Sequence, residues 1–139
     1  MITVETTIQL PLEKVWELWT LPVHIIHWNF ASEEWHCPQA INDLQSGGIL
    51  FWRMEAKDGS MGFDFSGTYD HIQPQENINF TLDDDRKVSV EFISLGKRTK
   101  VIEHFEPENQ NSLALQRSGW QSILDNFKRY AENRESASI

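Results

Sequence analysis

RSGWQSILDNFKRY, residues 117–130, carries the clearest structural signal in the chain. Large apolar side chains recur through it at helical spacing, namely Trp120, Ile123, Leu124, Phe127 and Tyr130. Polar and charged side chains occupy the other side, which makes the predicted helix amphipathic. A face that carries three large aromatic rings needs a partner surface. This helix therefore covers either a solid core or a hollow that holds a ligand.

The N-terminal part of the chain predicts one strand followed by two short helices. Residues 2–9, ITVETTIQ, alternate and are rich in β-branched side chains, which favours a strand. Pro11 stands where the start of a helix tolerates proline, and LEKVWELWT continues from it with helical spacing. A second short helix is predicted from Pro22 to about Trp28. The segment from Trp35 to Ile41 is predicted to be irregular.

Alternating apolar residues then dominate, as is typical of antiparallel strands with one buried face. Strands are predicted from about Ile49 to Ala56 and in MGFDFSGTYDHI, NINFTL, VSVEFISL and TKVIEHFEP. Turn signals separate them at Asp58-Gly59, in the charged run DDDRK and at Gly96-Lys97. The terminal helix is predicted from about Ser112 to Arg134.

The order of these elements indicates an α+β fold, and 139 residues correspond to a single domain over positions 1–139. A curved antiparallel sheet of about six to seven strands is expected, with two short helices after the first strand. The long C-terminal helix is the only long amphipathic element left to cover the sheet. We therefore expect its aromatic side to pack on the inner face of the sheet.

Composition and charge narrow the possible partners. The formal net charge is −9, which disfavours nucleic acid and anionic membrane surfaces because both attract basic proteins. The sequence shows no apolar run long enough to cross a bilayer and no signal peptide, so membrane insertion is not expected. The single cysteine, Cys37, cannot form an internal disulfide, and a cytoplasmic location follows as the expectation. A monomer and a homodimer both remain open.

Four stretches together resemble a known architecture: VWELWT, LQSGGILFWRMEAKDGSMGFDFSGTYDHIQP, TKVIEHFEPE and QRSGWQSILDNFKRY. They resemble the helix-grip fold of the START-like (SRPBCC) superfamily, also called Bet v-like. More closely, the chain is similar to bacterial proteins related to the C-terminal domain of the activator of the heat-shock-protein-90 ATPase. The combination of a DGS turn, an F-x-G-x-Y strand and a terminal GWQ-x-I-L-x-N-F helix carries this resemblance, which covers nearly the whole chain.

The resemblance implies a deep cavity between the curved sheet and the C-terminal helix. Members of the superfamily use such a cavity for lipids, sterols, polyketides or other apolar molecules, and a few use it for chemistry. The eukaryotic activator uses this kind of domain to contact a chaperone, alongside a separate N-terminal domain for which this chain has no room. We therefore expect non-catalytic binding of a small hydrophobic or amphipathic molecule. A chaperone-interaction module and a cyclase or hydrolase type of enzyme are the alternatives.

The expected ligand-binding residues are Trp28, Trp35, Phe51, Arg53, Phe65, Tyr69, Phe80, Val101, Glu103, Trp120, Leu124 and Phe127. Most are apolar or aromatic, as in ordinary ligand pockets. Trp28 and Trp35, together with Phe30, are expected either to gate the mouth of the cavity or to plug the end of the core.

Two charged residues stand mid-strand among these apolar neighbours. If the face of TKVIEHFE that holds Val101 and Phe105 is concave, then Glu103 points inward. A buried carboxylate needs a partner or becomes neutral, and Arg53 is the expected partner. These residues form a structural ion pair or are exposed strand charges, or else the pair fixes the polar end of a ligand.

The sequence predicts no catalytic residue, no metal and no cofactor. His24 and His27 share a helix face, but no paired metal-binding motif accompanies them. A nucleophile with its base, or two carboxylates that flank a bond, is not recognisable in the sequence. The candidate titratable groups are Glu55, Asp64, His71, Glu103 and His104. Alternation places the last two on opposite faces of their strand, and catalysis stays an open alternative.

Overall fold

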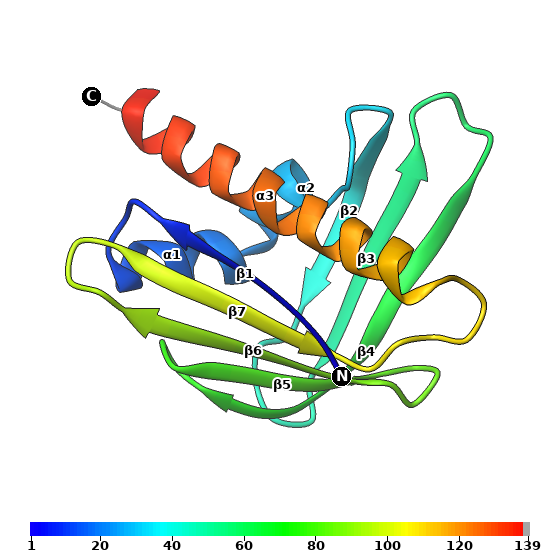
Figure 1. The fold of residues 1–139 in the computed structure, drawn as a ribbon, viewed down its shortest axis with the longest axis horizontal. Coiled ribbons are helices and arrows are strands. Elements are labelled where there is room, and N and C mark those ends of the chain that lie inside the picture. Colours follow the sequence, from blue (N-terminus) through cyan, green and yellow to red (C-terminus); the bar gives the residue numbers. More distant parts are fainter. Residues whose placement is uncertain (138–139) are drawn as a thin grey trace.

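The computed structural model describes residues 1–137 and consists, over that range, of one antiparallel sheet and three helices (Figure 1). In chain order the elements are β1 (Ile2–Ile8), α1 (Leu12–Thr20), α2 (Pro22–Trp28), β2 (Trp35–Asn42), β3 (Ile49–Ala56), β4 (Gly62–Gln73), β5 (Asn77–Leu82), β6 (Lys87–Ser94), β7 (Thr99–Phe105) and α3 (Leu113–Ala137).

The sheet is a curled, seven-stranded antiparallel half-barrel with the strand order β1-β7-β6-β5-β4-β3-β2. Each strand from β2 to β7 pairs with its neighbour in sequence, and β1 closes the other edge by pairing with β7. Helix α3 runs along the inside of the curl, while α1 and α2 lie at one end of it (Figure 1). The predicted α+β helix-grip fold is therefore confirmed.

Alternation along the strands decides which side chains face the helix. In β7 every second residue from Thr99 to Phe105 is buried, which places Glu103 on the inner face. In β3 the buried residues include Trp52 and Met54, whereas the residues between them are only partly buried on the outer face. Successive strand residues point to opposite sides of a sheet, so one buried position fixes the orientation of its neighbours.

Helix α3 also protects the free edge of β1. Three of its polar side chains donate hydrogen bonds to carbonyl oxygens of alternate β1 residues: Arg117 to Thr3 at 2.6 Å, Gln121 to Glu5 at 3.2 Å, and Lys128 to Thr7. An uncovered edge strand exposes unpaired backbone groups that invite pairing with another chain. The polar side of the amphipathic helix is thus used at the sheet edge, while its apolar side faces the interior.

Strand β2 corrects one sequence prediction, because residues 35–41 were expected to be irregular. The segment is the outermost strand next to β3, and its register shifts between His36 and Gln39. Pro38 lies inside that shift, and proline is tolerated at bulges and on edge strands because no ladder hydrogen bond is required of it there. Because proline is rare inside regular strands, the sequence pattern did not indicate a strand here.

Gly67 explains the F-x-G-x-Y pattern of β4. A Cβ atom built at this position would lie 2.4 Å from the carbonyl oxygen of Thr81 on β5. No other residue type fits without displacing backbone, so glycine permits the close approach of β4 and β5. The ladder shifts register just beyond it, between Tyr69 and His71.

The end of the fold next to α1 and α2 is a solid core. Trp19, Trp28 and Phe127 are buried there, and their ring centroids are separated by 4.7 to 4.9 Å. Leu124 is also fully buried. This half of α3 therefore covers packed side chains, which is one of the two possibilities that the helix pattern left open. No helix in the described range is long and apolar enough to span a membrane.

Candidate functional site

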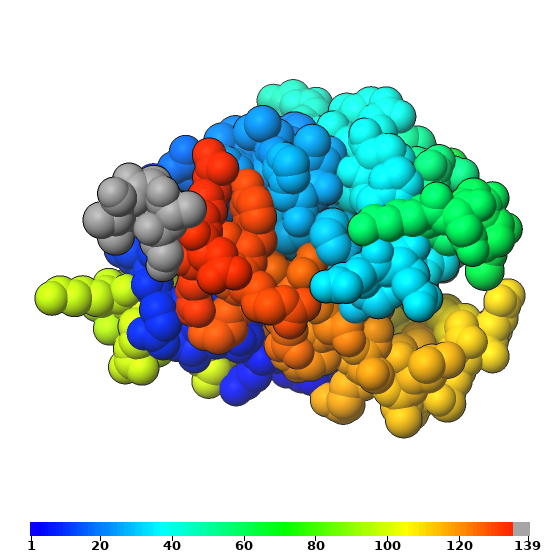
Figure 2. Space-filling view, turned by 90° about the horizontal axis from the view of Figure 1, so that it is seen from above, coloured from blue at the N-terminus to red at the C-terminus, as the bar shows by residue number. Residues whose placement is uncertain are grey.

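The other half of α3 covers a cavity of about 630 Å³ between the helix and the inner face of the sheet. Its walls are mostly apolar and include seven aromatic side chains: Trp19, Trp28, Trp52, Phe63, Phe65, Phe80 and Trp120. Met54, Met61, Val90 and Ile123 complete the apolar lining. Figure 2 shows the surface hollowed between the green turn after β3 and the gold segment after β7.

Stacked rings hold the aromatic wall in place. Trp52 stacks on Phe65 with ring centroids 5.4 Å apart, and Phe65 meets the edge of Trp120 at 5.9 Å. Trp120 in turn stacks on Phe105 of β7 at 3.9 Å. These contacts link β3, β4, α3 and β7 around the cavity, so its shape is set before a ligand enters. The indole Nε1–H of Trp52 is buried and has no acceptor among the described residues.

Glu103 is the polar group that stands out in this wall. It lies on β7 between Val4 and Val90 in the sheet register, and only 7% of it is exposed. Within the described part of the chain its carboxyl has neither a hydrogen-bond nor an ion-pair partner. Burial raises the pKa of Glu103 to about 8, because the charged form loses its hydration without gaining a counter-charge. At neutral pH the group is mostly a neutral carboxylic acid.

Arg53 does not pair with Glu103, and that prediction is wrong. The side chain lies on the outer face of β3, where its Nε donates to Glu55 at 2.9 Å and its Nη1 donates to Asp64 at 3.1 Å. Phe51 lies on the same outer face, since both alternate with the buried Trp52. The prediction took Phe51 to face inward. Because side chains two residues apart in a strand share a face, Arg53 was placed inward as well.

The structure brings five of the expected ligand-binding residues together in the wall of the cavity: Trp28, Phe65, Phe80, Glu103 and Trp120. Trp35 lies with Phe30 beside an adjoining hollow of about 280 Å³. Four others are buried in the packed interior and are not part of the wall: Tyr69, Val101, Leu124 and Phe127. The hydroxyl of Tyr69 donates to Asn42.

Sequence reasoning missed several wall residues, among them Trp19, Trp52, Met54, Phe63, Val90 and Ile123. Most of them carried a usable signal. Trp52 and Met54 share one face of β3, and Val90 shares the inner face of β6 with two other buried residues. The opposite choice of face for β3 would have selected the first two.

A polar rim borders the cavity where β7 leads into α3. Gln116 is buried in the first part of α3, and its Nε2 donates to the carbonyl oxygens of Glu108 at 3.0 Å and Asn111 at 2.9 Å. The carboxylate of Glu108 accepts hydrogen bonds from the backbone N–H groups of Gln110 and Asn111. These bonds, which lower the pKa of Glu108, keep it ionised at the rim.

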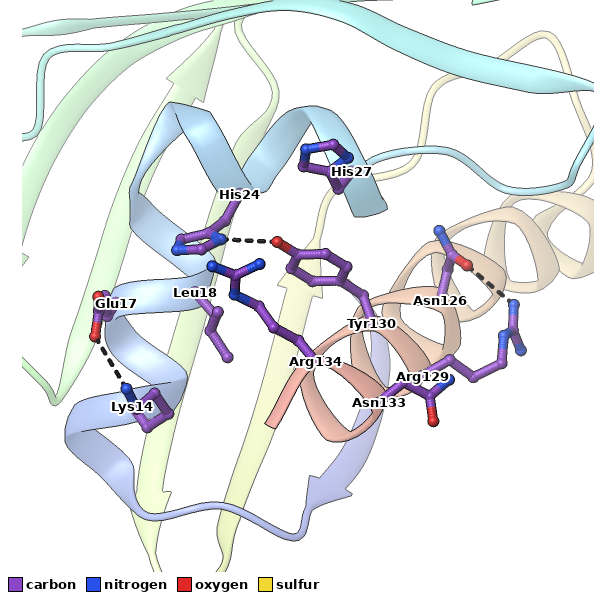
Figure 3. A pocket seen from close by; sticks show the side chains of 10 residues that line it. All are labelled: Lys14, Glu17, Leu18, His24, His27, Asn126, Arg129, Tyr130, Asn133 and Arg134. Atoms are coloured by element: carbon purple, nitrogen blue, oxygen red, sulfur yellow. Dashed lines mark hydrogen bonds and ion pairs between the residues drawn. The ribbon is translucent and has the colours of Figure 1, made fainter. Parts of the chain in front are cut away.

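A larger hollow of about 880 Å³ lies on the outside, between α1, α2 and α3 (Figure 3). It is more open and its lining is largely charged and polar, with Leu18 among the few apolar members. Tyr130 contacts both histidines of this hollow: the tyrosine hydroxyl lies 2.8 Å from Nδ1 of His24, and the tyrosine ring stacks on His27. Burial lowers the pKa of His24 and favours the neutral ring. Despite its size, this surface groove lacks the enclosing apolar walls of a small-molecule site.

No group of three or more potential metal ligands occurs within the described residues. The carboxyl of Glu103 likewise has no nucleophile or base hydrogen-bonded to it in that part of the chain. What the cavity offers chemically is an apolar surface with one buried carboxyl, that of Glu103, and charged groups at its rim.

A family model described as "Activator of Hsp90 ATPase homolog 1-like protein" matches residues 9–132. An AHSA1-like protein from Aeromonas hydrophila, solved by NMR, is 41% identical with a TM-score of 0.88, over 96% of this chain and 94% of that one. A protein from Cytophaga hutchinsonii is 49% identical with a TM-score of 0.82, over 97% and 94% of the two chains. A comparison with curated proteins gave no match.

A protein from Nitrosomonas europaea shares the fold at only 15% identity, with a TM-score of 0.78 over 97% of this chain and 96% of that one. At such low identity the likeness concerns the architecture alone. The two relatives above 40% identity are matched over almost their whole length and share this fold.

Proposed function

The chain belongs to the family of activator of Hsp90 ATPase homolog 1-like proteins, and on that premise we propose that it binds a small apolar or amphipathic molecule in the cavity beneath α3. The observation that carries this proposal is the cavity of about 630 Å³ with mostly aromatic and aliphatic walls. Ligand sites in proteins typically have volumes of about 300–1,000 Å³ and this kind of lining.

The binding energy would come from removing apolar surface from water. A ligand that buries about 300 Å² of apolar surface gains about 7.5 kcal/mol at about 25 cal/mol per Å², before the cost of immobilising it. The stacked rings of Trp52, Phe65 and Trp120 support the proposal further, because a wall that is already ordered keeps the additional ordering cost small. A lipid, sterol or polyketide type of skeleton fits this chemistry.

The role is proposed as binding without catalysis. Chemistry on a bound molecule needs a placed nucleophile, or an acid and base on either side of a reacting bond. Within the described part of the chain, Glu103 is the one carboxyl buried in the wall, and a lone buried acid suits recognition of a polar group better than turnover.

Contact with a chaperone is the second candidate, and the exposed apolar side chains near the opening favour it. Met61, Leu113 and Leu115 are each at least 60% exposed, and exposed apolar clusters often mark protein contacts. A pull-down with a purified heat-shock ATPase tests this candidate. Retention that is lost in a Leu113→Ser, Leu115→Ser double variant would support it, and no retention by the parent would remove it.

A fluorescence titration with N-phenyl-1-naphthylamine tests the main proposal, since this neutral apolar probe brightens in apolar sites. We expect saturable binding of one molecule per chain. Ile123→Trp fills the cavity from α3 and should abolish binding, whereas Ile93→Trp adds the same bulk at an exposed position outside it and should not. Equal binding by both variants, or no binding by the parent, would contradict the proposal.

A further inference from the structure

We propose that the cavity selects a cationic ligand: an apolar amine whose ammonium group pairs with the carboxylate of Glu103 among aromatic rings. This inference rests on the proposed binding function and names the chemical class of the ligand. Three independent features carry it: the unpartnered carboxyl, the aromatic walls and the charge of the whole chain.

The first feature is a buried acid without a cation. Glu103 lies in a row of the sheet with Val90 and Ile78, and the next inward row along β7 holds Phe105. These neighbours offer no positive charge and no hydrogen-bond donor. Keeping such a carboxyl costs stability unless something else pairs with it, so its presence in the wall is explained most directly by a ligand that supplies the cation.

The other charged groups in the wall are already engaged at its rim. Arg86 is the one cationic side chain that lines the described cavity, and its Nε donates to Asp84 at 2.8 Å. Glu108 accepts backbone hydrogen bonds, as described above, and contributes a second negative charge near the entrance. Burial alone accounts for the raised pKa of Glu103, with no contribution from either of these groups.

The second feature is the number of aromatic rings that line the same cavity as this carboxyl. An ammonium group over the face of a tryptophan is attracted by the negative face of the ring, and the attraction strengthens when water is excluded. The cavity supplies four tryptophans, Trp19, Trp28, Trp52 and Trp120. Trp120 stacks on Phe105, two residues from Glu103 on the same face of β7, so ring and acid lie in one region of the wall.

The third feature is the net charge of −9, which attracts cations to the protein and repels anions. A long-chain carboxylate would be repelled by the negative charge of the protein as it enters. Inside the cavity it would also lie near the carboxyl of Glu103. The same apolar skeleton with an amine therefore binds better than with a hydroxyl, and better still than with a carboxylate.

Calorimetry with three ligands of one shape tests the inference: 2-naphthylmethylamine, 2-naphthalenemethanol and 2-naphthoate. At pH 7 the amine should bind at least tenfold more tightly than the alcohol, and the carboxylate more weakly than the alcohol. Glu103→Gln should reduce amine binding to the level of the alcohol while changing alcohol binding less than twofold. Glu91→Gln removes the same charge from the outer face, where Glu91 lies 3.2 Å from His104, and should leave the preference intact.

Proton release provides a second readout. Free Glu103 is mostly protonated at pH 7, so pairing with an ammonium ion should release close to one proton in the parent and none in Glu103→Gln. Amine affinity should accordingly rise between pH 6 and pH 8, while alcohol affinity should not.

Equal affinity for amine and alcohol would overturn the cationic preference and leave the cavity proposal standing. An amine preference that survives Glu103→Gln, or amine binding without proton release, would also overturn it. Failure of all three naphthalene compounds and of N-phenyl-1-naphthylamine to bind would overturn the binding function itself.

Discussion

Replacing Glu103 by Gln should stabilise the protein, and the gain should grow with pH. The native carboxyl must stay largely protonated because it is buried without a partner, whereas in the unfolded chain it ionises freely. Glutamine has nearly the same shape and is neutral at every pH. The substitution therefore removes the cost of keeping a proton on Glu103 and leaves the packing of the wall almost unchanged.

The magnitude follows from the two pKa values. Burial raises the pKa of Glu103 from 4.5 to about 8, so between these values the folded state binds more protons than the unfolded state. Stability then falls as pH rises across this window, by about 1.4 kcal/mol per unit. The buried carboxyl leaves the free energy of unfolding of the parent unchanged at pH 4. It lowers this free energy by about 3 kcal/mol at pH 7 and by about 5 kcal/mol at pH 9.

Urea unfolding of the parent and of Glu103→Gln at pH 4.5, 7 and 9 measures this difference. Groups other than Glu103 titrate alike in both proteins, so their contributions cancel. Glu91→Gln is the matched control, because Glu91 is only partly buried on the outer face and should show no such trend. A difference in the free energy of unfolding that is constant across the three pH values would refute the reasoning.

Four further substitutions test the packing. Gly67→Ala should destabilise the fold by about 1–3 kcal/mol, because the new Cβ would meet the Thr81 carbonyl oxygen. Gly119→Ala in α3 places its Cβ in open space and should stabilise the fold by about 0.5–1 kcal/mol. Urea denaturation measures both changes. Phe127→Ala should cost about 3–5 kcal/mol in the same assay, since the ring is fully buried in the solid core. Trp52→Phe should cost clearly less than that, because it also removes a buried indole N–H that lacks an acceptor; an equal loss in thermal and urea unfolding would contradict this.

The architecture could be predicted from the sequence because its periodicities are strong. The alternation of β7 placed Glu103 on the inner face, where the structure has it, and the apolar stripe of α3 indicated a helix packed against the sheet. Strand β2 was not predicted, because Pro38 and a register shift interrupt its alternating pattern. Arg53 was assigned to the wrong face because β3 carries large apolar residues on both sides, so alternation alone did not choose between Phe51 and Trp52.

Whether α3 covers a core or a hollow could not be predicted from its own residues. Leu124 and Phe127 are fully buried in packed side chains, while Trp120 and Ile123 on the same apolar stripe border the cavity. The difference lies in what packs beneath the helix: at one end Trp19 of α1 and Trp28 of α2 contact Phe127. These contacts come from other elements of the chain and cannot be read from the spacing of apolar residues in α3.

Native mass spectrometry of freshly purified protein tests the ligand-binding proposal most directly, with the parent and Ile123→Trp compared before and after addition of N-phenyl-1-naphthylamine. We expect the parent to carry an apolar adduct, either co-purified or the added probe, at one molecule per chain. The filled variant should appear as the bare chain. A bare mass for the parent under both conditions would contradict the proposal that the space beneath α3 is a ligand site.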